Sequence, residues 1–556
     1  MLHTFLSAIK SFSPKEFTIF LVCSALVLLT GVLLIIQLIN TYTVSVPAQG
    51  GTFTEGVVGQ VAYLNPVLAR EGSADRDAVA LLFASVYDLA ELIEHDEEFR
   101  SWSLRLKEEA VWHDNTPVTS DDIVFTVQII QNTDAASPHF SNWQNVSVER
   151  VSEREVLFET VNTYALFENL LHDLRPIPKK YFADLSPANI RLSAFNLKPI
   201  GSGPFVFEEL EKRADGFITS IFMKKNERYH AIGTLPHLDR FVMLYFENED
   251  LLMRSFNKGL IDGFGSFTPR IAEYAEINTQ QNNISTSRYY AVFLNQNAHS
   301  ALASPAVRRA LWLFVDREAL IQDVFAGHAV VQQGPLPAYQ DTALQNPVPA
   351  QGNTDEAHRL LEDNGWFFDD ETRTWNTVTD DETLAQLMFT IKIPDSPIVR
   401  QIAESVRNQW ETVGIKTKIE TTDANLFSED VLKTRNYEMI IYGNILLPMP
   451  DLTSFWHSNE RFYPGLNFSL YESGTIDELL LQLRSIDPQS QSRNETLAIL
   501  AQEIVSQTPA LFIASPQYIY LTQAHTIGAP IDTIATPDAR FVRITEWYAK
   551  TKRVSR

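Results

Sequence analysis

A single uninterrupted apolar run near the N-terminus restricts this chain more than any other feature. It covers residues 17–39, FTIFLVCSALVLLTGVLLIIQLI, and contains no charged side chain. As a helix of about 23 residues rising roughly 1.5 Å each, it matches the ~30 Å hydrocarbon core of a bilayer. Lys10 and Lys15 precede the run, and no Lys or Arg follows it until well beyond the polar linker at 40–50. The positive-inside rule therefore predicts a single-pass anchor with residues 1–16 in the cytoplasm and the body outside the cell membrane.

Two other targeting signals were weighed against the anchor. A cleavable signal peptide would use Val46-Pro47-Ala48 as its small-residue site, but signal h-regions span only about 7–15 residues. A lipid anchor on Cys23 would have the large Val22 before it and apolar residues continuing past it. The retained helix is the favoured interpretation. Cys23 is also the only cysteine, which excludes an intrachain disulfide, a zinc–thiolate site and a CxxC redox pair.

The size and composition of the remaining chain predict a folded body of several domains. A length of 556 residues exceeds one ordinary core, and 45% hydrophobic with 11% aromatic residues is typical of well-packed proteins. A formal net charge of -24 argues against nucleic-acid binding, which needs clustered Lys and Arg. Strand-like and helix-like patterns alternate irregularly without a repeat, as in mixed α/β domains.

The stretch VWHDNTPVTSDDIVFT, residues 111–126, contains the best local candidate for acid–base chemistry. Thr119 followed by Asp121 and Asp122 is typical of a helix start, with a hydroxyl cap and carboxylates over the first-turn amides. His113 beside Asp114 in a turn predicts a surface hydrogen-bonding pair. The chain has no HExxH, GxSxG, Walker or GxGxxG motif. We therefore predict no catalytic residue, no metal ligand and no cofactor.

Further segments predict well-defined helices and strands. The stripe from Val399 to Val413 predicts a helix that Gly414 ends, and the alternating IKTKIE predicts a strand directly after it. The motifs that carry a resemblance to a known family follow one another in order along the chain. They are GGTFTEGVVGQVAYLNP, RLKEEAVWHDNTPVTSDDIVFTVQ, KPIGSGPFVF, NKGLIDGF, the block from LNQNAHS to QQGPLP, AHRLLEDNGW, QIAESVRNQWETVGIKTKIE and YESGTIDELLLQLRSIDPQSQSRNE.

In this order the segments resemble the extracytoplasmic solute-binding proteins of ABC importers, oligopeptide/dipeptide-binding class, also called bacterial solute-binding protein family 5. The likeness runs from about residue 51 to about residue 520. It implies an α/β, two-lobed, type II periplasmic-binding-protein-like fold with a small accessory domain. The first lobe would comprise 51–80, 200–285 and 521–556, the accessory domain 81–199, and the second lobe 286–520. It also implies a monomer that closes on its ligand by hinge motion.

The resemblance also implies where a ligand would bind. Glu55, Gly56 and Val57 correspond to the first-lobe strand end that pairs with ligand backbone. On the second lobe, Tyr442, Gly443 and Asn444 correspond to the family's Gly-Trp segment. Two later positions are expected near the cleft: Asp451, and Trp456 in the rim loop DLTSFWHS, the latter equally compatible with core packing.

One departure from the family pattern concerns the ligand's amino group. Peptide binders place an aspartate shortly after the Gly-Trp pair, and here that position is Leu446 or Leu447. Either Asp451 or Glu55 takes the role, or the ligand has no free amino terminus. The prediction is an oligopeptide receptor that delivers its ligand to ABC permease subunits. Sugars, metal chelates and a sensor or scaffold role without transport remain open alternatives.

Overall fold

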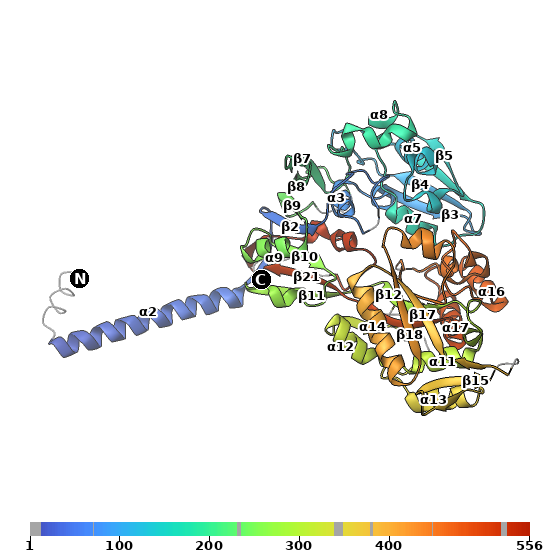
Figure 1. Cartoon of the computed structure of the whole chain (residues 1–556). Coiled ribbons are helices and arrows are strands. Elements are labelled where there is room, and N and C mark those ends of the chain that lie inside the picture. The colour runs from blue at the N-terminus through green and yellow to red at the C-terminus, as the bar shows by residue number, and fades with distance from the viewer. Residues whose placement is uncertain are drawn as a thin grey trace.

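The computed structural model describes residues 13–70, 72–230, 235–337, 348–378, 382–447, 449–523 and 531–555. A long helix projects from a body in which two lobes lie one beside the other, and in this view an accessory domain lies above the second (Figure 1). The helix, α2 (Pro14–Tyr42), has a mean hydropathy of 3.0 in its most apolar window, and none of that window is buried in the protein. It is long and apolar enough to cross a membrane. No residue of α2 belongs to a core cluster of the described body.

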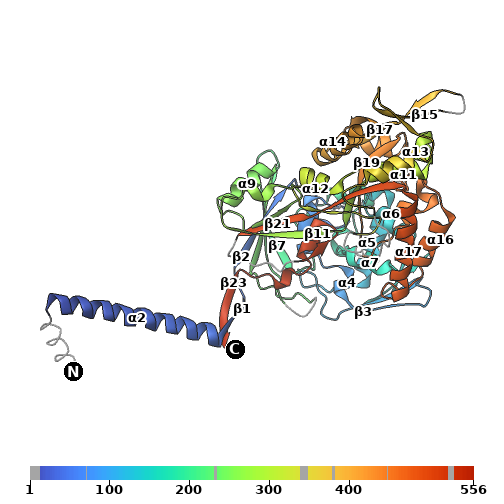
Figure 2. The ribbon, with the colours of Figure 1, turned by 90° about the horizontal axis from the view of Figure 1, so that it is seen from below.

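A two-stranded ribbon connects α2 to the body. β1 (Thr43–Ala48) runs antiparallel to β23 (Lys550–Ser555), so the C-terminal strand lies beside the segment that leaves the helix. Arg553 reaches back along this ribbon, and one of its Nη atoms donates to Asn40 Oδ1 at 2.8 Å. Figure 2 shows the ribbon standing between the helix and the body.

The first lobe is organised around a mixed eight-stranded sheet. The central strand β2 (Thr52–Val58) runs parallel to both of its neighbours, and further strands extend the sheet from them on each side. The order is β22 (Thr533–Ile534), β11 (Thr279–Thr286), β21 (Tyr518–Gln523), β10 (Gly263–Ser266), β2, β9 (Arg240–Phe246), β8 (Ile218–Lys225) and β7 (Phe205–Lys212). The helices of this lobe are α3 (Ala74–Leu82) and α9 (Glu249–Asn257), with 3-10 turns η4 (Ile271–Tyr274), η8 (Pro537–Phe541) and η9 (Ile544–Glu546).

The accessory domain carries its own four-stranded antiparallel sheet. Its order is β3 (Ala90–His95), β4 (Ser101–Leu106), β6 (Glu155–Thr160) and β5 (Val146–Ser152). The helices here are α4 (Val86–Leu89), α5 (Ser120–Gln131), α6 (Phe140–Trp143), α7 (Phe167–Asp173) and α8 (Lys179–Phe182), with turns η1 (Thr133–Ala135), η2 (Pro187–Leu192) and η3 (Ala194–Asn196). Thr119 and Asp122 form the predicted capping box of α5. Trp102 and Phe158 of this sheet share one apolar core with Phe53 of β2, so the domain packs continuously onto the first lobe.

The second lobe has a six-stranded sheet enclosed by helices. The order is β13 (Ala329–Val331), β20 (Ala510–Pro516), β12 (Arg288–Leu294), β19 (Met439–Ile445), β17 (Met388–Pro394) and β18 (Lys416–Thr422), and a small sheet adds β14 (Phe367–Asp369), β15 (Thr374–Val378) and β16 (Leu384–Gln386). Its helices are α10 (Ser300–Ala303), α11 (Pro305–Leu313), α12 (Arg317–Phe325), α13 (Thr354–Glu362), α14 (Pro397–Thr412), α15 (Thr453–Trp456), α16 (Gly474–Leu483) and α17 (Gln491–Gln507), with turns η6 (Ser428–Leu432) and η7 (Ser458–Arg461).

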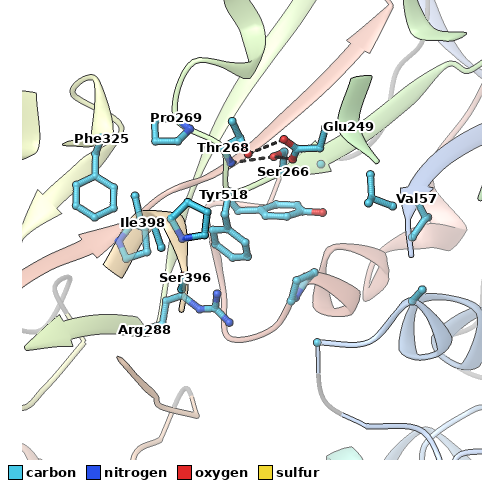
Figure 3. Close-up of a pocket in the computed structure, with 18 of the residues that line it drawn as sticks. Val57, Glu249, Ser266, Thr268, Pro269, Arg288, Phe325, Ser396, Ile398 and Tyr518 are labelled. Carbon is cyan, nitrogen blue, oxygen red and sulfur yellow. Dashed lines mark hydrogen bonds between the residues drawn. The ribbon is translucent and has the colours of Figure 1, made fainter. Parts of the chain in front are cut away.

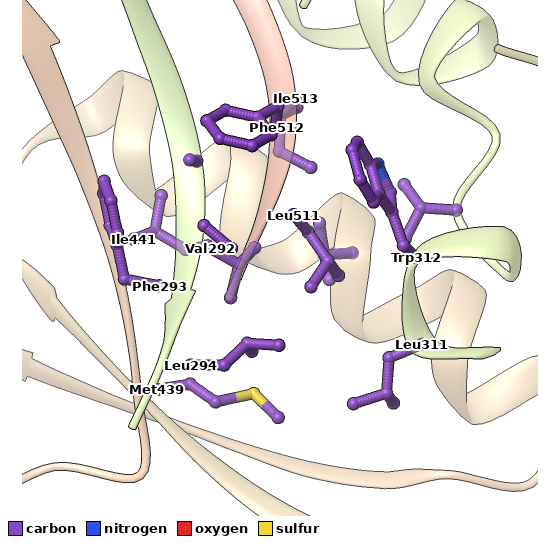
Figure 4. Packing of buried hydrophobic residues seen from close by; sticks show 14 of the residues in the cluster. Val292, Phe293, Leu294, Leu311, Trp312, Met439, Ile441, Leu511, Phe512 and Ile513 are labelled. Atoms are coloured by element: carbon purple, nitrogen blue, oxygen red, sulfur yellow. The ribbon is translucent and has the colours of Figure 1, made fainter. Parts of the chain in front are cut away.

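The core of this lobe forms where α11 packs against the sheet. Val292, Leu511 and Phe512 of the central strands lie close to Trp312 of α11 (Figure 4). The predicted 399–413 helix is α14, and the IKTKIE strand is β18.

Two short crossovers join the sheets of the two lobes. Ser287 alone separates β11 from β12, and Gln517 alone separates β20 from β21. The crossovers lie side by side, because Ser515 Oγ donates to the Thr286 carbonyl and Thr286 Oγ1 donates to the Pro516 carbonyl. The predicted two-lobed α/β fold with one N-terminal apolar helix is therefore confirmed.

Candidate functional site

A cavity of about 600 Å³ lies between the two lobes, beside the crossovers. The first lobe contributes the end of β2, the start of α3, the loop after β10 and η8, and the second lobe contributes the starts of β12 and α14 (Figure 3). The wall comprises Gly56, Val57, Val58, Gly72, Ser73, Ala74, Asp77, Glu249, Gly265, Ser266, Phe267, Thr268, Pro269, Arg288, Tyr290, Phe325, Ser396, Pro397, Ile398, Gln401, Pro516, Tyr518, Pro537 and Arg540. Its volume is within the range of small-molecule sites.

The sheet topology explains why the cavity forms there. β2, β9 and β10 run parallel, so their carboxyl ends meet at one edge of the first-lobe sheet. Ligands of open α/β sheets bind in the crevice outside the carboxyl ends of parallel strands. The second lobe closes this crevice because Ser287 leads directly from β11 into β12.

The floor of the cavity is a buried ionic cluster. Arg540 donates to Glu55 Oε1 from two nitrogens, at 2.9 and 3.1 Å, and to both oxygens of Asp77, at 2.6 and 2.8 Å. The Tyr520 hydroxyl donates to Glu55 Oε2 at 2.6 Å. Glu55 is completely buried, and the side chains of Arg540 and Asp77 are 3% and 9% exposed. One guanidinium thus serves two carboxylates.

The surplus carboxylate in this cluster has an unusual proton affinity. Burial raises the pKa of Glu55 to about 7, although the Arg540 charge and the Tyr520 hydroxyl act in the opposite direction. A carboxyl group removed from water favours its neutral form unless a dedicated positive charge nearby compensates the ionised form. Glu55 is therefore a structural proton-binding group below the cavity, because its side chain is fully enclosed by protein.

The three predicted first-lobe residues thus divide into two groups. Gly56 and Val57 line the cavity, whereas the Glu55 side chain lies beneath it and is engaged by Arg540. Gly56 has a packing reason of its own, because a Cβ there would lie 2.5 Å from Ile261 Cδ1. The strand end can therefore present its backbone to the cavity but not the Glu55 carboxylate.

The three predicted second-lobe residues lie on β19, next to the cavity wall. Gly443 pairs with Tyr290, and Asn444 pairs with Tyr289, whose hydroxyl accepts from Asn444 Nδ2 at 3.0 Å. Tyr442 stacks on Phe427 with ring centroids 6.0 Å apart. Among the described residues, β17 pairs with β19 only through its Ile391 and Lys392. The later residues of β19 consequently have one backbone edge without a neighbouring strand, which is the geometry that accepts an added strand.

The last two predicted residues lie away from the interlobe cavity wall. Asp451 lies 3.8 Å from Arg484, and its Oδ1 accepts the Thr453 amide. Trp456 is 1% exposed and packs near Phe512 in the second-lobe core, with ring centroids 5.9 Å apart. Of its two expected placements, Trp456 adopts the core one.

Leu447, one of the two positions where the family pattern has a carboxylate, lines a second cavity of about 420 Å³. Met449 lies beside it, and the accessory domain and C-terminal segment complete the wall. Asn169 Nδ2 donates to the Met449 carbonyl at 3.0 Å, so the accessory domain contacts the second lobe here. Asp173, the carboxylate of this wall on α7, is bound by Arg76.

His113 differs from its prediction. Both of its ring nitrogens bond to the backbone of the glycine turn: the Gly201 amide donates to Nδ1 and Nε2 contacts the Gly203 carbonyl, each at 3.2 Å. Burial lowers the pKa of His113 to about 4. Asp114 instead accepts from Tyr181 and Thr116. His113 is therefore a partly buried residue that fixes the glycine turn, and not half of a surface pair. In the described part of the chain, no three His, Cys, Asp or Glu side chains gather as a metal site.

Several wall residues were not predicted from the sequence. Arg288, Glu249 and Tyr518 come from three separate segments that only the folded topology brings together. Arg288 carried a usable signal: it is a lone basic residue directly before the apolar strand YYAVFL. Glu249 carried none, since as a first-turn acidic residue it is adequately explained as a helix-dipole partner.

The fold and the interlobe cavity can now be compared with known proteins. A family model described as bacterial extracellular solute-binding proteins, family 5, middle region, matches residues 84–462. The chain belongs to this family. Its members are solute-binding proteins, so the predicted family is confirmed.

Relatives and solved structures agree with this membership. The oligopeptide-binding protein AppA of Bacillus subtilis is 24% identical over 488 residues, covering 84% of this chain and 87% of AppA. The AppA structure in complex with a nonapeptide has a TM-score of 0.69 and 22% identity, and covers 90% of this chain and 99% of that chain. A putative peptide-binding AppA from Clostridium difficile gives a TM-score of 0.74 at 20% identity, with 90% and 100% covered. NikZ of Campylobacter jejuni, in complex with Ni(L-His), gives 0.68 at 18% identity, with 89% and 99% covered.

Proposed function

We propose that this protein is a membrane-tethered receptor that captures oligopeptides between its lobes and delivers them, chemically unchanged, to an ABC permease. The observation that supports this most directly is the pair of backbone edges at the cavity. The end of β2 lines it from one lobe. On the other lobe, Gly443 pairs with the wall residue Tyr290, and residues 441–445 have no β17 partner on their opposite edge. An extended ligand can bond to both edges through its main chain, which accommodates many sequences.

The binding residues proposed here follow from that arrangement. Gly56 and Val57 would offer backbone groups from the first lobe, and Tyr442, Gly443 and Asn444 from the second. Each main-chain hydrogen bond contributes about 0.5–1.5 kcal/mol, so several are needed for useful affinity. The other predicted residues would support the site indirectly: Glu55 through the buried ionic cluster, Asp451 through its contact with Arg484, and Trp456 through the second-lobe core.

The domain division follows the two sheets. We propose that the first lobe comprises 51–80, 200–286 and the segment from β21 onward, that 81–199 forms the accessory domain, and that the second lobe is the intervening chain. Ser287 and Gln517 would be the hinge residues, since each joins one sheet to the other. A hinge of this kind needs only a few residues that absorb the rotation.

Native mass spectrometry of the full chain, purified in detergent from its own host, tests the peptide assignment. We expect acid denaturation of one sample to release peptides of varied sequence, and a second, native sample to retain a pool of synthetic oligopeptides. Release of a single sugar or metal chelate, with no retention of peptides, would overturn the peptide assignment. Copurification of permease subunits would support the transport role, whereas a sensor would lack them.

The tether is proposed from α2 and the charges before it. In intact cells, added protease should cleave the body while the segment before α2 stays protected. Deleting residues 1–42 should release a folded monomer to the soluble fraction, because α2 contributes nothing to the described cores. A truncated chain that stays with the membrane would contradict a single tether.

A further inference from the structure

Arg288 stands out among the charged residues of the interlobe cavity because no carboxylate of the described residues pairs with it. It begins β12, directly after the Ser287 crossover, and its guanidinium lies over the Phe267 ring at 4.3 Å from the centroid. Figure 3 shows the guanidinium pointing into the cavity. Its Nε is buried without a hydrogen-bond partner. Within the described residues it forms no ion pair with a carboxylate, so its charge has no protein partner in the cavity.

Arg288 is half-buried, whereas two fully buried arginines show how this protein satisfies such a group. Arg308 is 1% exposed and donates to backbone carbonyls of Leu302 and Gln507, among others. Arg540 binds two carboxylates. Partial removal of a guanidinium from water without such partners is unfavourable. Burial accordingly lowers the pKa of Arg288. An unsatisfied cation on the wall of a cavity indicates that its partner arrives with the ligand.

The cavity's own acidic residues are occupied elsewhere. Asp77 is bound through both oxygens by Arg540. Glu249 accepts hydroxyl hydrogen bonds from Ser266 and from Thr268, the latter at 2.6 Å. Figure 3 places this Glu249 group at the end of the cavity opposite Arg288. Neither acid forms an ion pair with Arg288 among the described residues.

We propose that Arg288 binds a carboxylate of the ligand, and that this cavity therefore selects solutes with an anionic end. In its most specific form the carboxylate is the peptide C-terminus, and that form rests on the proposed peptide function. One face of the guanidinium lies on Phe267, so its edge remains available to a ligand. The planar fork of N–H donors at that edge matches a carboxylate through two parallel hydrogen bonds. An acidic side chain of the ligand offers the same chemistry as the C-terminus.

Peptide pools that differ only in charge provide the test. Three random-sequence pools, tetra- to nonapeptides, are offered to the full chain in detergent: one free at the C-terminus and lacking Asp and Glu, one amidated, and one amidated but containing Glu. Retained peptides are quantified by mass spectrometry. The variants are Arg288→Gln, Arg288→Lys as the charge-conserving rescue, and Glu249→Gln as the matched control at the other end of the cavity.

We expect the wild type to retain free acids about tenfold better than amides, equivalent to ~1.4 kcal/mol. Arg288→Gln should retain both equally, Arg288→Lys should recover part of the preference, and Glu249→Gln should keep the wild-type ratio. Strong retention of the Glu-containing amides would support the side-chain form of the same proposal. Equal retention of acids and amides by the wild type, or an unchanged preference in Arg288→Gln, would overturn it.

Failure of the peptide function gives a different result. If the wild type retains none of the pools, the peptide assignment fails, and thermal unfolding with citrate then decides the role of Arg288. A melting temperature that citrate raises in the wild type, but not in Arg288→Gln, would support the anion site for a non-peptide solute. No shift in the wild type would overturn it.

Discussion

Raising the pH from 5 to 8 should destabilise the folded body through Glu55. This carboxyl titrates with a pKa of about 7 in the native state because burial outweighs its contacts with Arg540 and Tyr520, whereas 4.5 applies to the exposed group. A folded-state pKa above the unfolded value means that the native state binds the proton more tightly. The stabilisation is therefore fully present below pH 4.5 and is lost as the pH rises through about 7.

The magnitude follows from the two pKa values. Between pH 5 and pH 8 the linkage relation gives a loss of roughly 2 to 3 kcal/mol in the free energy of unfolding. Urea unfolding of the full chain in detergent, followed by tryptophan fluorescence at both pH values, measures it. Glu55→Gln keeps the side-chain shape and removes the titration. We therefore expect its pH dependence to be smaller than that of the wild type by this amount.

Comparing the wild type with Glu55→Gln also cancels the contributions of other titrating groups to the pH dependence of stability. Burial lowers the pKa of His113 and of His230 to about 4. Their contribution to the free energy of unfolding therefore decreases as the pH falls below about 6.5. Their contribution has the opposite sign and is present in both proteins, so it cancels in the difference. If wild type and Glu55→Gln change equally between pH 5 and pH 8, Glu55 is ionised throughout, and the surplus-carboxylate account of the cluster is refuted.

Two further perturbations test other parts of the structure. Arg540→Met should cost about 3 to 5 kcal/mol of unfolding free energy in the same assay, because it leaves two buried carboxylates without a cation, while Arg543→Met at an exposed pair should change nothing measurable. Asn169→Ala removes a hydrogen bond between the accessory domain and the second lobe, so ligand dissociation in stopped-flow experiments should be several-fold faster; an unchanged rate would show that this contact does not hold the lobes closed.

The elements of the fold were predictable where local chemistry determines them. Thr119 and Asp122 signal the start of α5 because the capping groups are only three residues apart. The stripe that begins at Val399 defines α14, because one helical face must be apolar to pack on the sheet. The apolar run at 17–39 likewise needs no tertiary information.

The site was less predictable because its chemistry depends on contacts between distant segments. Glu55 lies on a strand covered on both faces, so its side chain had no exposed side to occupy, and its partner Arg540 is 485 residues away. Strand alternation alone could not distinguish a carboxylate that faces the ligand from one beneath it. Trp456 shows the same limit, since an aromatic residue near a rim is equally able to pack inward.

The arrangement of charges separates what keeps a lobe rigid from what can close the two lobes. Glu55, Asp77 and Arg540 all belong to the first lobe, so their ion pairs persist whether the cleft is open or closed. Arg288 belongs to the strand that enters the second lobe, and its missing partner would come from the ligand. A ligand shifts the open–closed equilibrium only through interactions that differ between the two states. A carboxylate held by Arg288 while the ligand backbone bonds to β2 would connect the lobes only in the closed state. Binding energy from that contact would therefore be converted into closure, which is what a receptor must signal to its permease.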